Sequence, residues 1–95
     1  MINFIQTTVA KYSNLEFWQN IGEDRIRNNK FKGSLWIKGR KKGFRLQTTS
    51  EIASILDTEI EKLHGNPVGE QKGYKYWHID DYRLVEQIIE FLAKS

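Results

Sequence analysis

Apolar and polar side chains alternate in two stretches of the chain, residues 31–38 and 44–48. A repeat of two places every second side chain on one face, so each stretch predicts a half-buried β-strand. The loop between them, residues 39–43, is short and basic and predicts an antiparallel hairpin. The apolar positions of this hairpin then face the core: Phe31, Leu35, Ile37, Phe44 and Leu46.

The C-terminal half predicts two helices around an aromatic strand. Apolar residues recur at helical spacing from Ile52 to Leu63 and again from Leu84 to Leu92. The first helix begins with a capping box from Thr48 to Glu51, or with Ser50 as the N-cap; Asp80 or Asp81 caps the second. Residues 68–73 predict a loop, and residues 74–79 predict the aromatic strand.

The N-terminal third is less regular. Ser13 and Glu16 have the spacing of a capping box, which predicts a short helix over residues 14–21 that ends at Gly22. Residues 4–12 form either a strand or a helix, with Thr7, Thr8 and Val9 favouring the strand. Residues 25–27 predict another short strand.

These elements together predict an α+β fold with a small antiparallel sheet, a basic β-hairpin and helices packed on one face. The order is roughly (α/β)-β-β-α-β-α. The 95 residues form a single domain, in which residues 1–24 could be a loosely attached N-terminal segment.

Charge is distributed very unevenly along the chain. Residues 25–45 contain nine basic side chains and no Asp or Glu, although the net charge of the whole chain is only +3. The remaining residues contain 6 basic and 12 acidic side chains. A separation this sharp concentrates positive charge on one surface and indicates a polyanionic or acidic partner.

The outer face of the hairpin is the predicted binding site. Cations neutralise phosphates, and an exposed indole can stack on a base. The sequence therefore predicts a small non-enzymatic module that binds DNA or RNA, without distinguishing the two. The predicted nucleic-acid-binding residues are Lys30, Lys32, Trp36, Lys38, Arg40, Lys41, Lys42, Arg45 and Gln47.

Two alternatives remain open at this point. The basic strip could be a solvated edge, with Trp36 packed under the N-terminal helix. The acidic side chains of the first C-terminal helix could instead bind a protein; they are Glu51, Asp57, Glu59 and Glu61. The chain would then be a protein-interaction module or an inhibitor that docks on a nucleic-acid-handling enzyme.

Catalysis and cofactor binding find little support in the sequence. Cysteine is absent, which excludes disulfides and thiolate metal sites and agrees with a reducing, cytoplasmic setting. His78 with Asp80 and Asp81 could form a metal or nuclease cluster, but Asp80 or Asp81 is better explained as a helix cap. We expect no cofactor, no metal, no signal peptide and no membrane segment.

Residues 73–77, with Asp80, Asp81, Leu84 and Ile88 after them, form a strand followed by a capped helix. This segment resembles the wing and following helix of MerR-like winged-helix regulators. That family also needs a helix-turn-helix just upstream, whereas residues 50–64 predict one continuous helix. The chain is therefore not assigned to the family, and the resemblance only agrees with DNA binding.

Overall fold

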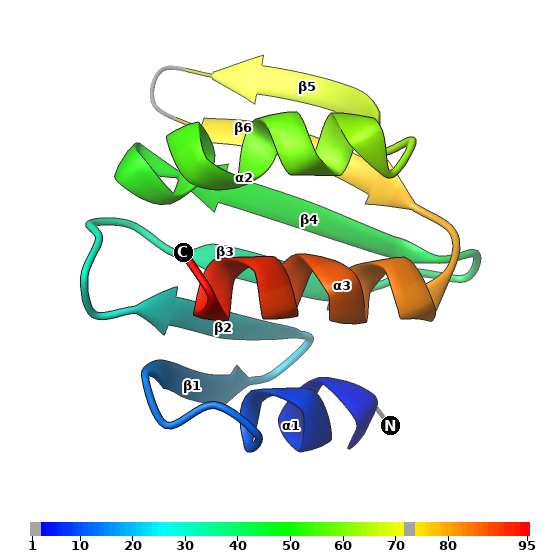
Figure 1. Ribbon diagram of the computed structural model, residues 1–95. Coiled ribbons are helices and arrows are strands. Elements are labelled where there is room, and N and C mark those ends of the chain that lie inside the picture. The colour runs from blue at the N-terminus through cyan, green and yellow to red at the C-terminus, as the bar shows by residue number, and fades with distance from the viewer. Residues whose placement is uncertain (1–2, 72–73) are drawn as a thin grey trace.

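One six-stranded antiparallel sheet organises the protein in the computed structural model, which describes residues 3–71 and 74–95 (Figure 1). The strands lie in the order β1-β2-β3-β4-β6-β5. Only the step from β4 to β6 joins strands that do not follow each other in the chain. The strands are β1 (Leu15–Asn20), β2 (Glu23–Asn28), β3 (Leu35–Gly39), β4 (Phe44–Thr49), β5 (Asn66–Gln71) and β6 (Tyr74–Ile79).

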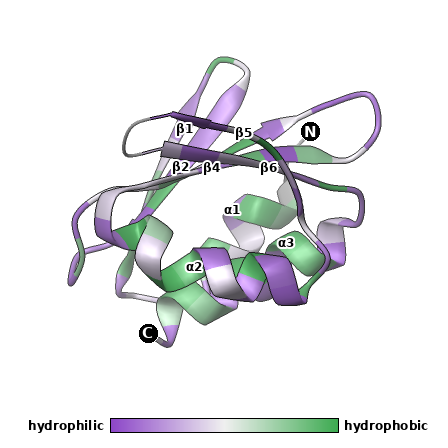
Figure 2. Cartoon of the chain, turned by 90° about the horizontal axis from the view of Figure 1, so that it is seen from above, coloured by the Kyte–Doolittle hydropathy of each residue, from purple (hydrophilic) through white to green (hydrophobic). Residues whose placement is uncertain are grey.

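The three helices α1 (Asn3–Val9), α2 (Ser50–Lys62) and α3 (Tyr82–Ala93) lie on the same face of the sheet. Viewed from above, the sheet forms one layer and the helices form a second (Figure 2). This confirms the predicted α+β class with helices packed on one face. In the described part of the chain, no helix combines the length and the apolar character needed to cross a membrane.

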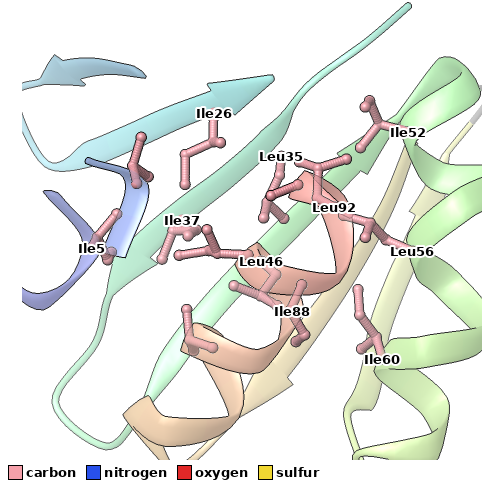
Figure 3. Close-up of a cluster of buried hydrophobic side chains, with 14 of the residues drawn as sticks. Ile5, Ile26, Leu35, Ile37, Leu46, Ile52, Leu56, Ile60, Ile88 and Leu92 are labelled. Carbon is pink, nitrogen blue, oxygen red and sulfur yellow. The ribbon is translucent and has the colours of Figure 1, made fainter. Parts of the chain in front are cut away.

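The core lies between these two layers (Figure 3). Leu35, Ile37 and Leu46 point into it from the central hairpin and are fully buried, as their alternation predicts. Phe31 and Phe44, also predicted to face the core, pack against it and are half-buried. The sheet also contributes Leu15, Ile26, Ile79 and Trp77, of which Ile26 of β2 and Trp77 of β6 are fully buried. The helices contribute Ile5, Val9, Ile52, Leu56, Ile60, Val85, Ile88, Ile89, Leu92 and Ala93.

Helix α1 packs on α3. Its Ile5 is fully buried in the common core. The Tyr12 hydroxyl, just beyond the helix, donates to a carboxylate oxygen of Glu90 at 3.1 Å. Desolvation, followed by this hydrogen bond to Glu90, raises the pKa of Tyr12. The N-terminal segment, from residue 3 onward, thus contributes both apolar and polar contacts to the fold.

One prediction for the N-terminal third was wrong, and one of two open alternatives proves correct. Residues 15–20 form strand β1, not a helix, because Leu15 and Phe17 face the core while Trp18 lies on the opposite side of the strand. The capping-box spacing concealed this period of two. Residues 3–9 form helix α1, although the β-branched residues favoured a strand. The predicted strand at residues 25–27 is confirmed as part of β2.

Three boundaries elsewhere also differ from the predictions. The first hairpin strand begins at Leu35, not at Phe31. The predicted loop at residues 68–73 is strand β5 up to Gln71, while Lys72 and Gly73 lie outside the described residues. Every residue of β5 is exposed, so the strand has no apolar alternation that could reveal it.

The start of α2 also differs from the predicted capping box. Thr49 is the N-cap and makes no capping hydrogen bond with its side chain. The Thr48 hydroxyl instead donates to Asp57 at 2.8 Å, and the Glu51 carboxylate accepts from the Lys32 backbone N–H at 2.6 Å. At α3 the prediction holds, because Asp81 is the N-cap and accepts from the Arg83 backbone N–H.

Candidate nucleic-acid interface

One face of the sheet is not covered by the described helices (Figure 2) and is called here the open face. It carries most of the exposed aromatic and basic side chains of the strands. Successive side chains of a strand point to opposite faces of the sheet, so the residues of the open face alternate with those that point into the core. The larger side chains of the open face are Glu16, Trp18, Glu23, Arg25, Arg27, Trp36, Lys38, Arg45, Gln47, Tyr74, Tyr76 and His78.

One line of directly paired residues crosses the whole open face at right angles to the strands. Strand register aligns one residue from each of the six strands, and we call this set the central row. In spatial order it consists of Trp18, Arg25, Trp36, Gln47, Tyr76 and Gly69. Neighbouring strands lie about 4.8 Å apart, so the row presents three aromatic rings at intervals of two strand spacings.

Arg25 joins two of these rings. Its guanidinium carbon lies 4.7 Å from the centre of the Trp18 ring and 5.3 Å from that of Trp36. Its Nε also donates to the Ser34 hydroxyl at 2.8 Å. These contacts fix the guanidinium between the two indoles and hold both rings on the open face, where each ring keeps part of its surface accessible.

A hollow of about 230 Å³ lies beside Trp36 on the open face. We call it the central hollow. Trp36 and Tyr76 line it from β3 and β6, and Gln47 lies on the strand between them. Lys38, Arg45 and Glu23 complete its lining.

Arg45 connects this hollow to the hairpin tip. Its guanidinium carbon lies 4.5 Å from the centre of the Tyr76 ring. Arg45 also lines a second hollow, of about 360 Å³, together with Arg40, Val68 and His78. The two hollows share one arginine, so positive charge continues from the middle of the open face to residues 40–42 at the tip.

Most of these cations have no acidic partner. In the described part of the chain, Arg27 forms an ion pair with Glu16 at 3.6 Å, and the other salt bridges involve His78 and Arg83. The remaining basic side chains of the open face and the tip make no salt bridge with a described carboxylate: Arg25, Lys38, Arg40, Lys41, Lys42 and Arg45. Their charge is available to an external anion.

The structure brings together seven of the nine predicted site residues. Trp36, Lys38, Arg45 and Gln47 line the central hollow, and Arg40, Lys41 and Lys42 form the adjacent tip. Lys30 and Lys32 lie apart from these seven residues. Both precede the first residue of β3, so the alternation of the strand does not determine which way their side chains face. The Lys30 ammonium donates to the Ser95 carbonyl oxygen at 2.9 Å, near the end of α3.

Sequence reasoning missed four members of the central row, namely Gly69 and the side chains of Trp18, Arg25 and Tyr76. Trp18 was predicted to lie on a helix, and Arg25 was counted only as a charge. Tyr76 could have been found, because Tyr74, Tyr76 and His78 alternate with the buried Trp77 and Ile79. This alternation places the tyrosines on the face that Trp36 shares.

The alternative in which Trp36 packs under the N-terminal helix is wrong. The segment predicted to cover it is strand β1, and all three described helices lie on the other face of the sheet. Trp36 is half-buried by its neighbours within the sheet.

The histidine–aspartate candidate consists of one close contact. His78 Nε2 lies 2.8 Å from Asp80 Oδ1. The Asp81 carboxylate instead caps α3 and binds the Arg83 guanidinium, and these hydrogen bonds lower the pKa of Asp81. Among the described residues, no group of three or more acidic, histidine or cysteine side chains is arranged to hold a metal ion.

No protein-family model matches the chain, and comparison with curated proteins and with solved structures found no significant match. The chemistry of the open face therefore carries the functional inference.

Proposed function

We propose that the protein is a small, non-enzymatic nucleic-acid-binding module that holds its ligand on the open face and at the hairpin tip. One observation carries this proposal. The central row places three aromatic rings on a face where Arg25, Lys38 and Arg45 have no described carboxylate partner. The cysteine-free composition agrees with action in the cytoplasm.

Two physical effects support a nucleic-acid ligand. Cations that contact phosphates release condensed counterions, which makes binding favourable at low salt. Exposed aromatic rings stack on bases whatever their sequence, because every base has a π-face. The open face offers both groups within one or two strand spacings, and the three basic residues of the tip extend the cationic surface.

Salt dependence gives the first test. Five unpaired cations lie around the central hollow and the tip: Lys38, Arg40, Lys41, Lys42 and Arg45. If each contacts one phosphate of a single strand, the logarithm of affinity should fall with the logarithm of salt with a slope of roughly −3.5. A gel-shift or anisotropy titration at several salt concentrations measures this slope. An unchanged affinity, or no binding at low salt, contradicts the proposal.

A charge-reversal variant tests the location. Changing Arg40, Lys41 and Lys42 to Glu alters an exposed turn, so the fold should persist. Nucleic-acid affinity should fall by at least about tenfold, because three phosphate contacts become repulsive. Gly43 is left unchanged, since its φ is +80° and a side chain there would meet the Ile79 carbonyl.

The matched control reverses charge on α2. Glu59→Lys with Glu61→Lys should leave binding equal or slightly stronger. Asp57 is kept, because it accepts the Thr48 hydrogen bond. If the protein is instead an inhibitor that acts through this acidic helix, the α2 variant loses its partner and the tip variant retains it. Circular dichroism on both variants establishes that they are folded.

A further inference from the structure

The central hollow is a gap in the row of rings. Trp36 and Tyr76 are separated by one strand, so their backbones lie about 9.6 Å apart. The residue between them is Gln47, which is not aromatic. On the other side of Trp36 the corresponding space is filled by the Arg25 guanidinium. The gap over Gln47 is therefore the place in the row where a flat group from outside the protein can enter.

We propose that this gap is a slot for a single nucleobase of a single-stranded nucleic acid, flanked by Trp36 and Tyr76. This inference rests on the proposed function and adds the form of the ligand. The volume of about 230 Å³ is below the range of roughly 300–1,000 Å³ that is usual for small-molecule pockets. It suits one planar ring system better than a larger ligand.

The lining matches the parts of a nucleotide. The Trp36 ring provides a stacking surface for one face of a base. On the side of Tyr76 the planar Arg45 guanidinium, which lies 4.5 Å from the centre of the Tyr76 ring, provides the surface for the other face. The Gln47 amide offers both a donor and an acceptor to the base edge, and the Glu23 carboxylate offers an acceptor. Lys38 and Arg45 supply positive charge for the adjoining phosphates.

Access to the slot requires an unpaired strand. In a duplex both faces of each base are covered by stacking, and the edge that pairs is not free. Single strands can turn their bases outward, and proteins recognise such bases by stacking and by hydrogen bonds to their edges. The backbone of the strand would continue over Arg45 toward the second hollow, where Arg40 and His78 lie.

The experiment compares strands with and without bases. Anisotropy titrations use an ordinary single-stranded oligonucleotide, its abasic counterpart with the same phosphate backbone, and the matching duplex. Comparing DNA and RNA versions of the ordinary strand shows which of the two nucleic acids the protein prefers. The tested variant is Gln47→Phe, which fills the slot without changing charge. The control is Gln71→Phe, which adds the same ring on β5, outside the lining of the hollow.

The wild-type protein should bind the ordinary strand about 5- to 150-fold more tightly than the abasic strand. Gln47→Phe should lose this difference and keep the salt slope, whereas Gln71→Phe should retain both. Equal binding of ordinary and abasic strands, or tighter binding of the duplex, overturns the slot and leaves a backbone-binding module. Wild-type affinity in Gln47→Phe also overturns it. Failure to bind any of the ligands overturns the proposed function itself.

Discussion

Truncation of Trp36 to alanine separates a binding side chain from a structural one. The fold loses one of the two contacts of the Arg25 guanidinium with an indole, worth about 0.5–1 kcal/mol at an exposed site. It also loses cross-strand packing on a half-buried face, worth about 0.2–1 kcal/mol. The free energy of unfolding should therefore fall by roughly 1–2 kcal/mol. For a domain of this size each kcal/mol lowers Tm by about 4–8 °C, so the variant remains folded at room temperature.

The loss in binding should be comparable or larger. Stacking of a base on an aromatic side chain contributes about 1–3 kcal/mol, and Trp36 forms one side of the central hollow. Affinity for a single strand should drop by about 5- to 150-fold. The salt slope should not change, because the substitution removes no cation. An unchanged slope with a weaker affinity identifies a loss of stacking, since a loss of phosphate contacts would reduce the slope.

The chain supplies two matched controls. Trp18 makes the other cation–π contact with Arg25 but does not line the central hollow, so Trp18→Ala should cost similar stability and clearly less affinity than Trp36→Ala. Trp77 is fully buried, so Trp77→Ala should cost about 3–5 kcal/mol of stability. Thermal melts and anisotropy titrations on the three variants, all at one salt concentration, give both quantities for each tryptophan.

The reasoning fails if Trp36→Ala melts as low as Trp77→Ala, because Trp36 would then be a core residue. It also fails if Trp36→Ala binds single strands as tightly as the wild type. A third contrary result is an equal loss of affinity in Trp18→Ala and Trp36→Ala. In that case the indoles would act only by fixing the Arg25 guanidinium.

Two further predictions concern stability. Burial raises the pKa of Asp24, whose side chain is only 2% exposed and whose Oδ2 has no hydrogen-bond partner among the described residues. In the unfolded chain the pKa of an Asp side chain is about 3.9. The folded state binds the Asp24 proton more tightly than the unfolded chain does, so protonation of Asp24 stabilises the fold at low pH. This stabilisation is lost as the pH rises through the raised pKa of the folded state. Asp24→Asn should therefore raise Tm at pH 7 and leave it nearly unchanged near pH 3; a lower Tm at pH 7 would contradict this. Gly33 has a φ of +97°, and an added Cβ would collide with the Thr49 carbonyl. Backbone strain alone costs roughly 1–3 kcal/mol, so the free energy of unfolding of Gly33→Ala should fall by more than this amount. Gly22→Ala is the control in denaturant unfolding, since its φ is +85° but the space around it is open; equal losses in the two variants would argue against the collision.

The central hairpin and α3 could be predicted from the sequence because local signals agreed there. Leu35, Ile37 and Leu46 alternate around a turn, and the helical stripe of α3 begins directly after its cap, Asp81. The same parity correctly placed Trp36, Lys38, Arg45 and Gln47 together, because a strand has only two faces.

The rest depended on tertiary contacts that local patterns do not contain. Strand β1 is specified by its pairing with β2, which overrides the capping-box spacing of Ser13 and Glu16. Strand β5 is exposed throughout and is held by its ladder with β6. The central row joins residues from six strands, so its members are neighbours only once the register is known. For this reason Trp18 could not be connected to Trp36 from the sequence alone, and Tyr76 could be assigned to the same face but not to the same row.

The placement of all three described helices behind the sheet has an evolutionary consequence. The side chains of the open face lie outside the buried core, so most substitutions there should cost less stability than substitutions on the helix side. Natural proteins lie close to the stability limit for folding, which usually restricts how fast a binding surface can diverge. In this protein the need to keep the fold stable restricts substitutions mainly on the helix side of the sheet. The open face can accept new aromatic or charged residues and acquire new ligand preferences while the fold behind it stays constant.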